Sequence, residues 1–296
     1  MSIPTTESSN PASERIDALS SLEIVQLMNQ EDAKVAHAVA LEAEAIAKAI
    51  EIVTERMRRG GRLIYMGAGT SGRLGVLDAT ECPPTFNTHP DQVVGLIAGG
   101  YEAVTRAVEG AEDHPEFAVA DLKQVKLTDK DVVFGIASSG RTPYVLGGLE
   151  YAKQVGAAAI GLACNGGSEL AKVSEVIIAP LVGPEVISGS TRLKAGTATK
   201  MVLNMVTTGT MVMLGKTYGN YMVDLRATNT KLVARTRRIF AQLTGTNEQE
   251  AGRHLDACQG ELKTAIVAHR HKLTAEQARS LLAKHQGKLR AALEQA

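Results

Sequence analysis

Residues 61–86 read GRLIYMGAGTSGRLGVLDATECPPTF and contain the main indications of the fold. The stretch opens with the apolar run 63–66, which has the pattern of a buried strand, and breaks into the glycine-rich turn 67–72. It then resumes with a helical pattern of apolar residues. A strand that ends in such a turn and leads into a helix leaves unpaired backbone N–H groups pointing at one place, which suits an anion. The stretch therefore predicts a phosphate cradle, with Thr70 and Ser71 as its hydroxyl groups.

The glycine turn does not match either common nucleotide motif. The next apolar run ends in Ala98-Gly99-Gly100 instead of an acidic residue, which argues against a dinucleotide site. No Lys-Ser or Lys-Thr pair follows Gly72, so the turn is not a Walker loop either. A plain structural turn remains the alternative to an anion cradle.

Apolar runs and helical patterns alternate from residue 62 to residue 180. This pattern predicts an α/β fold with a doubly wound, parallel, five-stranded sheet covered on both faces. Ligands of such sheets bind beyond the carboxyl ends of the strands. The predicted strands are 62–67, 93–98, 131–137, 157–163 and 175–180, and the predicted helices between them are 72–81, 101–109, 115–124, 142–155 and 167–173.

Three further parts complete the predicted organisation. Residues 1–60 form a polar arm, either disordered or ordered against a neighbouring subunit, and an apolar-faced helix that begins at Asn29 with Asn29 and Asp32 as caps. Residues 61–230 form the sheet domain, which ends in a long buried helix over 194–218. Residues 231–296 form a small all-helical module, with helices at 231–243, 247–254, 260–268, 274–283 and 286–294.

The composition limits the classes of function. Lys and Arg total 32 and so do Asp and Glu, so no net positive field is available for nucleic acid or an anionic membrane. The most apolar segment, 201–214, is shorter than the roughly 20 residues that span a bilayer. The three cysteines show neither a disulfide framework nor metal spacing and fit a reducing cytoplasm.

A second hydroxyl-rich loop, with Ser138, Ser139 and Thr142, follows the predicted strand 131–137. Its geometry suits an anion, although Thr142 or Ser139 could instead simply cap the helix that starts near Pro143. A third loop, 183–192, precedes the long buried helix and contains Glu185, Ser188 and Ser190, with Lys194 just after it.

Two carboxylates have contrasting predicted settings. Glu81 is predicted in the last turn of a helix, where the helix dipole and a dry pocket would favour a general acid; the alternative is a solvated surface glutamate. Glu112 lies just before the helix start at Pro115, where a carboxylate is favoured and suits a base; the alternative is an acidic helix cap. Such opposed settings separate acid and base roles.

The motifs resemble the sugar isomerase (SIS) domain, a doubly wound sheet that binds phosphosugars. Four longer strings resemble the N-acetylmuramic acid 6-phosphate etherase family, to which the glucokinase regulatory protein is related. The strings are GAGTSGRLGVLDATECPPTF, GAED at 110–113, GPEVISGSTRLKAGTATKMVLNM and VDLRATNTKL at 223–232. The resemblance extends over nearly the whole chain, and its tail is similar to a ubiquitin-associated-like module.

The resemblance implies a lyase of cell-wall recycling that needs no cofactor and no metal. It would cleave the D-lactyl ether of N-acetylmuramic acid 6-phosphate by elimination and hydration, giving N-acetylglucosamine 6-phosphate and D-lactate. Glu81 matches the acid that protonates the departing lactate oxygen, and Glu112 matches the second essential carboxylate, assigned as the C2 base. Phosphate-binding positions match Thr70, Ser71, Ser138, Ser139 and Thr142, and other pocket positions match Glu185, Ser188, Ser190 and Lys194.

Two alternatives share the same fold. A phosphosugar isomerase also opens the ring and removes the C2 proton, but needs no acid at C3. A non-catalytic phosphosugar-binding regulator needs neither carboxylate. Under the etherase hypothesis, we expect the ligand to be a small-molecule phosphosugar and expect no nucleic acid or membrane partner. We also expect a homodimer with its active site near the subunit interface.

Overall fold

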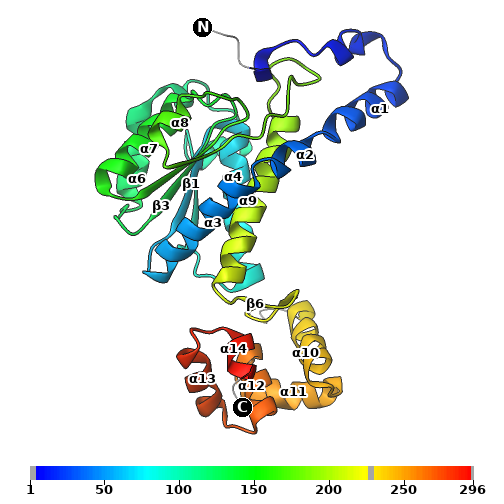
Figure 1. Ribbon diagram of the computed structural model, residues 1–296, viewed down its shortest axis with the longest axis vertical. Helices are drawn as coiled ribbons and strands as arrows, with labels where there is room; N and C mark the ends of the chain where they lie inside the picture. Colours follow the sequence, from blue (N-terminus) through cyan, green and yellow to red (C-terminus); the bar gives the residue numbers. More distant parts are fainter. Residues whose placement is uncertain (1–4, 226–229, 295–296) are drawn as a thin grey trace. The chain divides into compact units, whose positions relative to one another are not determined.

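The computed structural model describes residues 5–225 and 230–294. The chain divides into two compact units (Figure 1). One comprises Met1–Thr80 and Pro90–Thr207, and the other comprises Glu81–His89 and Thr208–Ala296. The division of the sequence into 1–60, 61–230 and 231–296 stays a prediction.

The first unit contains the predicted five-stranded parallel sheet. Its strands are β1 (Leu63–Gly67), β2 (Val93–Ile97), β3 (Val132–Ile136), β4 (Ala158–Leu162) and β5 (Val176–Ile178). They lie in the order β2-β1-β3-β4-β5, and every neighbouring pair is parallel. The topological switch point, where the order of successive strands reverses across the sheet, therefore lies between β1 and β3. Gly67 pairs in register with Ile136, so the carboxyl ends of these two strands are adjacent. The predicted fold class is confirmed.

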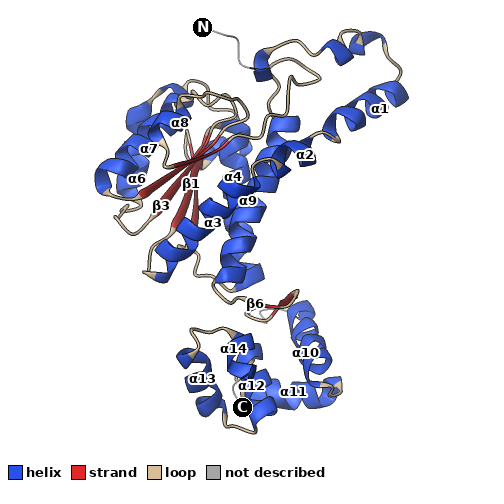
Figure 2. Ribbon diagram, in the orientation of Figure 1, coloured by secondary structure: helices blue, strands red, loops and turns tan. Residues whose placement is uncertain are grey.

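Helices cover both faces of the sheet (Figure 2). On one face α6 (Pro115–Gln124), α7 (Pro143–Val155) and α8 (Leu170–Val173) bury Ile64, Met66 and Val133. On the other lie α3 (Ala43–Arg58), α4 (Gly69–Phe86) and α9 (Lys194–Met213). There Tyr65 and Phe134 meet edge to face, with ring centroids 5.5 Å apart. Side chains of alternate strand residues thus fill two cores, as burial on both faces requires.

The N-terminal helical region differs from the prediction. It consists of α1 (Ser21–Asp32), α2 (Val35–Ala40) and α3, in place of one helix from Asn29. Asn29 and Asp32 lie in the last turn of α1, and a capping box of Ser20 and Glu23 begins that helix. The predicted apolar face is correct for most positions, since Val35, Val39, Ile46, Val53 and Met57 are buried.

The N-terminal arm, residues 5–18, is ordered against its own chain, so the alternative of a disordered arm was wrong. Its packing against a neighbouring subunit stays a prediction. It forms three short 3-10 turns, η1 (Thr5–Glu7), η2 (Pro11–Ser13) and η3 (Ile16–Ala18). Thr6, Asn10 and Ser13 are buried. Residues 1–4 of the predicted arm lie outside the described residues.

Three helix ends also differ from the prediction. Helix α4 begins at Gly69 and continues through Pro83 and Pro84 to Phe86, so Glu81 is not in its last turn and the dipole argument for this residue does not apply. The predicted helix 101–109 is reduced to α5 (Glu102–Thr105). Helix α9 ends at Met213, and the short hairpin of β6 (Thr217–Tyr218) and β7 (Tyr221–Met222) follows it.

The second unit contains the five helices predicted for the tail. They are α10 (Thr230–Thr244), α11 (Glu248–Ala257), α12 (Leu262–His271), α13 (Ala275–Lys284) and α14 (Leu289–Glu294). Their apolar faces share a core that includes Phe240, Leu262 and Ile266. The VDLRATNTKL string runs through 226–229, which lie outside the described residues. No helix in the described part of the chain is long and apolar enough to cross a membrane.

Candidate active site

The glycine turn lies at the carboxyl end of β1 and requires two of its glycines. A Cβ on Gly67 would stand 2.8 Å from the nitrogen of Gly72, and one on Gly72 would stand 2.7 Å from the oxygen of Gly67. Any side chain there would push the turn apart. The tight turn places Thr70 and Ser71 in the first turn of α4, where backbone N–H groups have no intrahelical partner. This is the geometry of an anion site.

The second hydroxyl-rich loop follows β3, directly beside the first. Gly140 has a φ of +70° and packs on Ser168, where a Cβ would come within 2.2 Å of the Ser168 Cβ. The Ser139 Oγ accepts a hydrogen bond of 3.3 Å from the Arg141 N–H. Thr142 is the N-cap residue of α7, but its side chain makes no capping hydrogen bond. The Thr142 hydroxyl therefore does not cap α7, which argues against the alternative that it serves only as a helix cap.

A cavity of about 170 Å³ brings the glycine turn and one of the two predicted carboxylates together. Its lining includes Ala68 and Gly69 from the turn, and Gly110 and Glu112 from the segment after α5. Glu112 is exposed and lies in the 3-10 turn η4 (Ala111–Asp113), just before α6 begins at Pro115 as predicted. The cavity thus places a carboxylate beside a cradle suited to an anion.

Arg73 lines the same cavity and was missed in the sequence. Its guanidinium donates hydrogen bonds of 3.1 Å to the Val104 carbonyl and 3.0 Å to the Arg106 carbonyl. Arg73 thereby ties the first turns of α4 to the segment that leads to Glu112. Its position one helical turn after Gly69 was the available signal, because that spacing places both residues on one face of the helix.

Glu81 lies on α4 but far along it from the glycine turn. At about 1.5 Å per residue, Gly69 and Glu81 are about 18 Å apart along the helix axis. The Glu81 side chain is exposed, as expected from the alternative of a solvated surface glutamate. The glycine turn and Glu81 are thus farther apart on one chain than the length of a hexose 6-phosphate.

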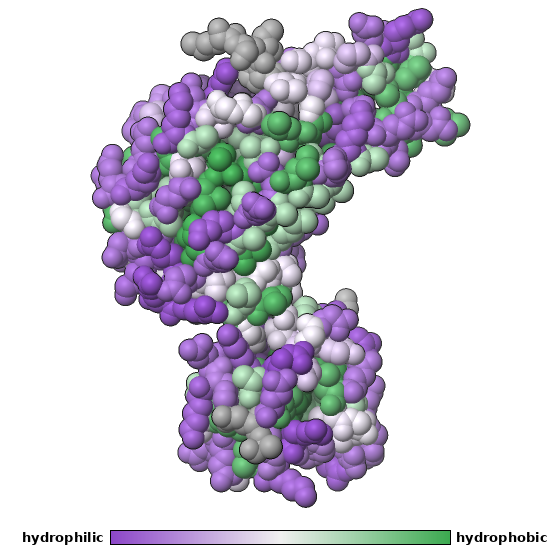
Figure 3. Space-filling model, viewed as in Figure 1, coloured by the Kyte–Doolittle hydropathy of each residue, from purple (hydrophilic) through white to green (hydrophobic). Residues whose placement is uncertain are grey.

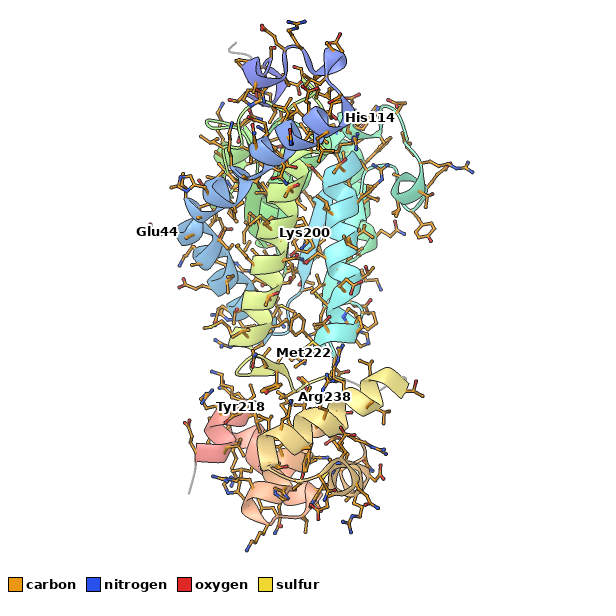
Figure 4. The ribbon with its side chains drawn as sticks, turned by 90° about the vertical axis from the view of Figure 1, so that its right-hand side faces the viewer. Glu44, His114, Lys200, Tyr218, Met222 and Arg238 are labelled. Atoms are coloured by element: carbon orange, nitrogen blue, oxygen red, sulfur yellow. The ribbon has the colours of Figure 1, made fainter. Side chains whose placement is uncertain are left out.

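Asp78 anchors the middle of α4, and sequence reasoning also missed this residue. Its carboxylate accepts hydrogen bonds from the Tyr65 hydroxyl at 2.9 Å and from the Asn204 amide of α9 at 2.6 Å. Burial raises the pKa of Asp78 above its ordinary value, although these hydrogen bonds act to lower it. Helices α4 and α9 run side by side (Figure 4), and Asp78 links them.

The third predicted group of site residues has partners inside the protein. Glu185 is fully buried and accepts hydrogen bonds from the backbone N–H groups of Lys194 at 3.0 Å and Ala195 at 2.9 Å, so it caps α9. The Lys194 side chain is only 1% exposed, and its Nζ contacts Glu31 Oε2 at 2.6 Å. The Ser188 hydroxyl donates to the Glu7 carbonyl at 2.9 Å, and Ser190 is half-buried. Ser188 thus contacts the N-terminal arm, and Lys194 contacts α1.

Among residues 5–225 and 230–294, no group of three or more His, Cys, Asp or Glu side chains is arranged to hold a metal ion.

Comparison with known proteins identifies the class first. Residues 45–153 match the model of the glucokinase regulatory protein N-terminal SIS domain, and residues 118–209 match the SIS domain. A candidate phosphosugar isomerase involved in capsule formation, from Bacteroides fragilis, has a related structure with a TM-score of 0.52 and 22% identity. The likeness covers 66% of this chain and 91% of that chain. The sheet and its loops thus form a SIS fold.

Full-length relatives then give the family. An N-acetylmuramic acid 6-phosphate etherase of Rhodopirellula baltica is 61% identical over 96% of this chain and 94% of its own length. Another, from Clostridium beijerinckii, is 55% identical over 98% of this chain and 96% of its own. The chain belongs to the N-acetylmuramic acid 6-phosphate etherase family.

Proposed function

We propose that the protein is a carbon–oxygen lyase that cleaves the D-lactyl ether of N-acetylmuramic acid 6-phosphate. The products are N-acetylglucosamine 6-phosphate and D-lactate, and the reaction serves amino sugar recycling from the cell wall in the cytoplasm. The cavity that joins the glycine turn to Glu112 carries this proposal, because it sets a carboxylate beside a phosphate cradle. The names of the full-length relatives support the substrate.

The reaction follows from the chemistry of the ether. An alkoxide leaves poorly at neutral pH, so cleavage needs an acid at the ether oxygen and a carbonyl that acidifies the neighbouring carbon. Opening of the sugar ring supplies an aldehyde at C1. A base then removes the C2 proton, lactate leaves C3, and water adds to the resulting unsaturated aldehyde.

Each group of site residues has a role in this scheme. Thr70, Ser71, Ser138, Ser139 and Thr142 bind the phosphate, a handle remote from C2 and C3 that positions the sugar. Glu112 acts as the C2 base, and its place in one cavity with Gly69 of the glycine turn supports this role. Glu81 protonates the departing lactate oxygen and then activates the water. Glu185, Ser188, Ser190 and Lys194 shape the pocket through the contacts that they make within the protein.

The active form in this proposal is a homodimer in which the second chain supplies Glu81. The spacing of about 18 Å along α4 supports this arrangement, since the Glu81 of one chain is too distant for the sugar held at its own glycine turn. Helix α1 also exposes apolar side chains, with Leu22 66% and Val25 63% exposed, and Figure 3 shows apolar surface over this helix. A second copy of the chain would cover them.

Isotope labels in the solvent test the reaction. The protein is incubated with N-acetylmuramic acid 6-phosphate in D2O and, separately, in water labelled with ¹⁸O. The expected products are lactate without the label and N-acetylglucosamine 6-phosphate with deuterium at C2 and ¹⁸O at C3. Label in the lactate would mean cleavage on the other side of the ether oxygen. Isomerisation without lactate release would favour the phosphosugar isomerase, and binding without turnover the regulator.

A further inference from the structure

The N-terminal arm is hydrogen-bonded to the third loop, 183–192. The Ser188 hydroxyl donates to the Glu7 carbonyl at 2.9 Å and to the Ser8 carbonyl at 3.2 Å. The Gly189 N–H donates to the Thr6 carbonyl at 3.2 Å. The Asn10 amide donates to the Pro184 carbonyl at 3.1 Å. In three of these four hydrogen bonds the acceptor is a backbone carbonyl of the arm, so the conformation of the arm sets that of the loop.

The same arm reaches the second loop through one side chain, Asn165. This residue follows β4 at the carboxyl edge of the sheet and is buried. Its amide group donates to the Thr6 hydroxyl at 3.0 Å and to the Ser138 carbonyl at 2.8 Å. Its carbonyl oxygen accepts from the Thr6 N–H at 3.3 Å. Both amide hydrogens and the oxygen therefore have partners, and Thr6 itself is 0% exposed.

We propose that Asn165 and Thr6 are positioning residues of the phosphosugar site, and that the N-terminal arm acts as a strap that holds the Ser138 and Ser188 loops in their binding conformations. The inference rests on the proposed function, because that function assigns these loops to the substrate. Neither Asn165 nor Thr6 needs to contact the sugar. Asn165 acts on the Ser138 carbonyl, and Thr6 keeps the Asn165 amide oriented.

The expected kinetic effect follows from what the loops bind. The phosphate lies away from the reacting carbons, so its contacts are about equally strong in the ground state and in the transition state. Loss of such uniform binding raises KM and leaves kcat nearly unchanged. A residue that served stability alone would lower the melting temperature without this change in KM at assay temperatures well below melting.

Isosteric substitutions in the full-length protein test the inference. Asn165→Asp keeps the shape of the side chain but removes both N–H donors, and Thr6→Val removes only the hydroxyl. We expect Asn165→Asp to raise KM for lactate release about tenfold or more with kcat within about threefold, the scale of one or two buried hydrogen bonds. Thr6→Val should have a smaller effect in the same direction, and Thr6→Ser, which keeps the hydroxyl, should restore the wild-type KM.

Thr54→Val is the matched control. The Thr54 hydroxyl is buried in α3 and has no hydrogen-bond partner within the described residues, so its loss should leave KM unchanged. A KM within twofold of wild type in Asn165→Asp would overturn the inference, as would an equal rise in Thr54→Val. Absence of lactate release from the wild-type protein would instead refute the proposed function, so the two failures are distinguishable.

Discussion

At the scale of single residues, the predicted catalytic carboxylates Glu81 and Glu112 are both exposed, but they lie on different kinds of element. Glu112 sits in the short turn after Gly110, and Arg73 ties the preceding segment to α4. Glu81 belongs to the continuous helix α4, one turn after the buried anchor Asp78. Because α4 is a rigid element, it fixes the direction in which the Glu81 side chain leaves the helix. A catalytic acid requires such fixed positioning.

The role of Glu81 can be tested with an isosteric variant. Glu81→Gln keeps the size of an exposed side chain, so the fold should be unaffected. It cannot donate the proton that the leaving lactate needs. Because a positioned acid contributes about 100-fold or more, lactate release should fall by at least that factor.

Glu150→Gln is a suitable comparison, because Glu150 is an exposed glutamate of α7 and has no proposed role. Rates of lactate release and far-ultraviolet circular dichroism would be measured for both variants. Full activity of Glu81→Gln would remove Glu81 from the acid role.

At the scale of the elements, a buried ion pair joins α1 to the start of α9. Lys194 contacts Glu31 at 2.6 Å, and the two side chains are 1% and 5% exposed. Burial acts to raise the pKa of Glu31, but the hydrogen bonds from Lys194, Lys34 and Asn10 outweigh it and lower the pKa to about 2 from 4.5. The contacts of Glu31 therefore link both helices to the N-terminal arm.

The lowered pKa of Glu31 makes part of the free energy of unfolding depend on pH in the acid range. The folded-state pKa of Glu31 is below its unfolded value, so its contribution is present above pH 4.5 and is lost as the pH falls from 4.5 to about 2. At about 1.4 kcal/mol per pKa unit the contribution is on the order of 3 kcal/mol. Glu31→Gln should therefore unfold more easily than the wild type at pH 7, and the difference should shrink towards pH 2–3.

Denaturant titrations of both proteins at several pH values would measure this difference in unfolding free energy. Glu55→Gln provides the control, since Glu55 is 51% exposed and pairs with Arg59 at the surface. It should change the free energy of unfolding by less than about 1 kcal/mol at any pH. If Glu31→Gln lowered the free energy of unfolding by the same amount at every pH, the negative charge of Glu31 would make no contribution to stability.

At the scale of the whole molecule, the separation of the glycine turn from Glu81 bears on the assembly. A site that takes Glu112 from one chain and Glu81 from another is incomplete in the monomer. Two inactive variants, Glu81→Gln and Glu112→Gln, can then repair each other. In their heterodimer one site has both substitutions and the other site has none.

We expect equal amounts of the two variants, unfolded and refolded together, to regain activity. Random pairing gives heterodimers in half of the molecules, each with one intact site, so activity should reach about a quarter of wild type. Each variant refolded alone is the control and should stay inactive. Light scattering should give twice the chain mass of 31.3 kDa. If the mixture stays as inactive as its parts, both carboxylates act within one chain or one of them has no role.

Local signals in the sequence predicted much of the fold. The five strands are short aliphatic runs, and the helices of the second unit have apolar faces at helical spacing, so neighbouring residues alone identify them. Ends of elements were less predictable. The helix predicted over 72–81 continues through Pro83 and Pro84 to Phe86, because tertiary packing can outweigh local preference.

The sequence by itself determined the parallel sheet, the glycine turn with Thr70 and Ser71, and the family, because each is recorded in local patterns of residues that are neighbours in the chain. Only the tertiary structure decided how the N-terminal arm packs, which partners Lys194 and Glu185 have, and that Arg73 lines the cavity with Glu112. These contacts join residues far apart in the chain. Their formation depends on the folding of the whole unit, and no local pattern records them.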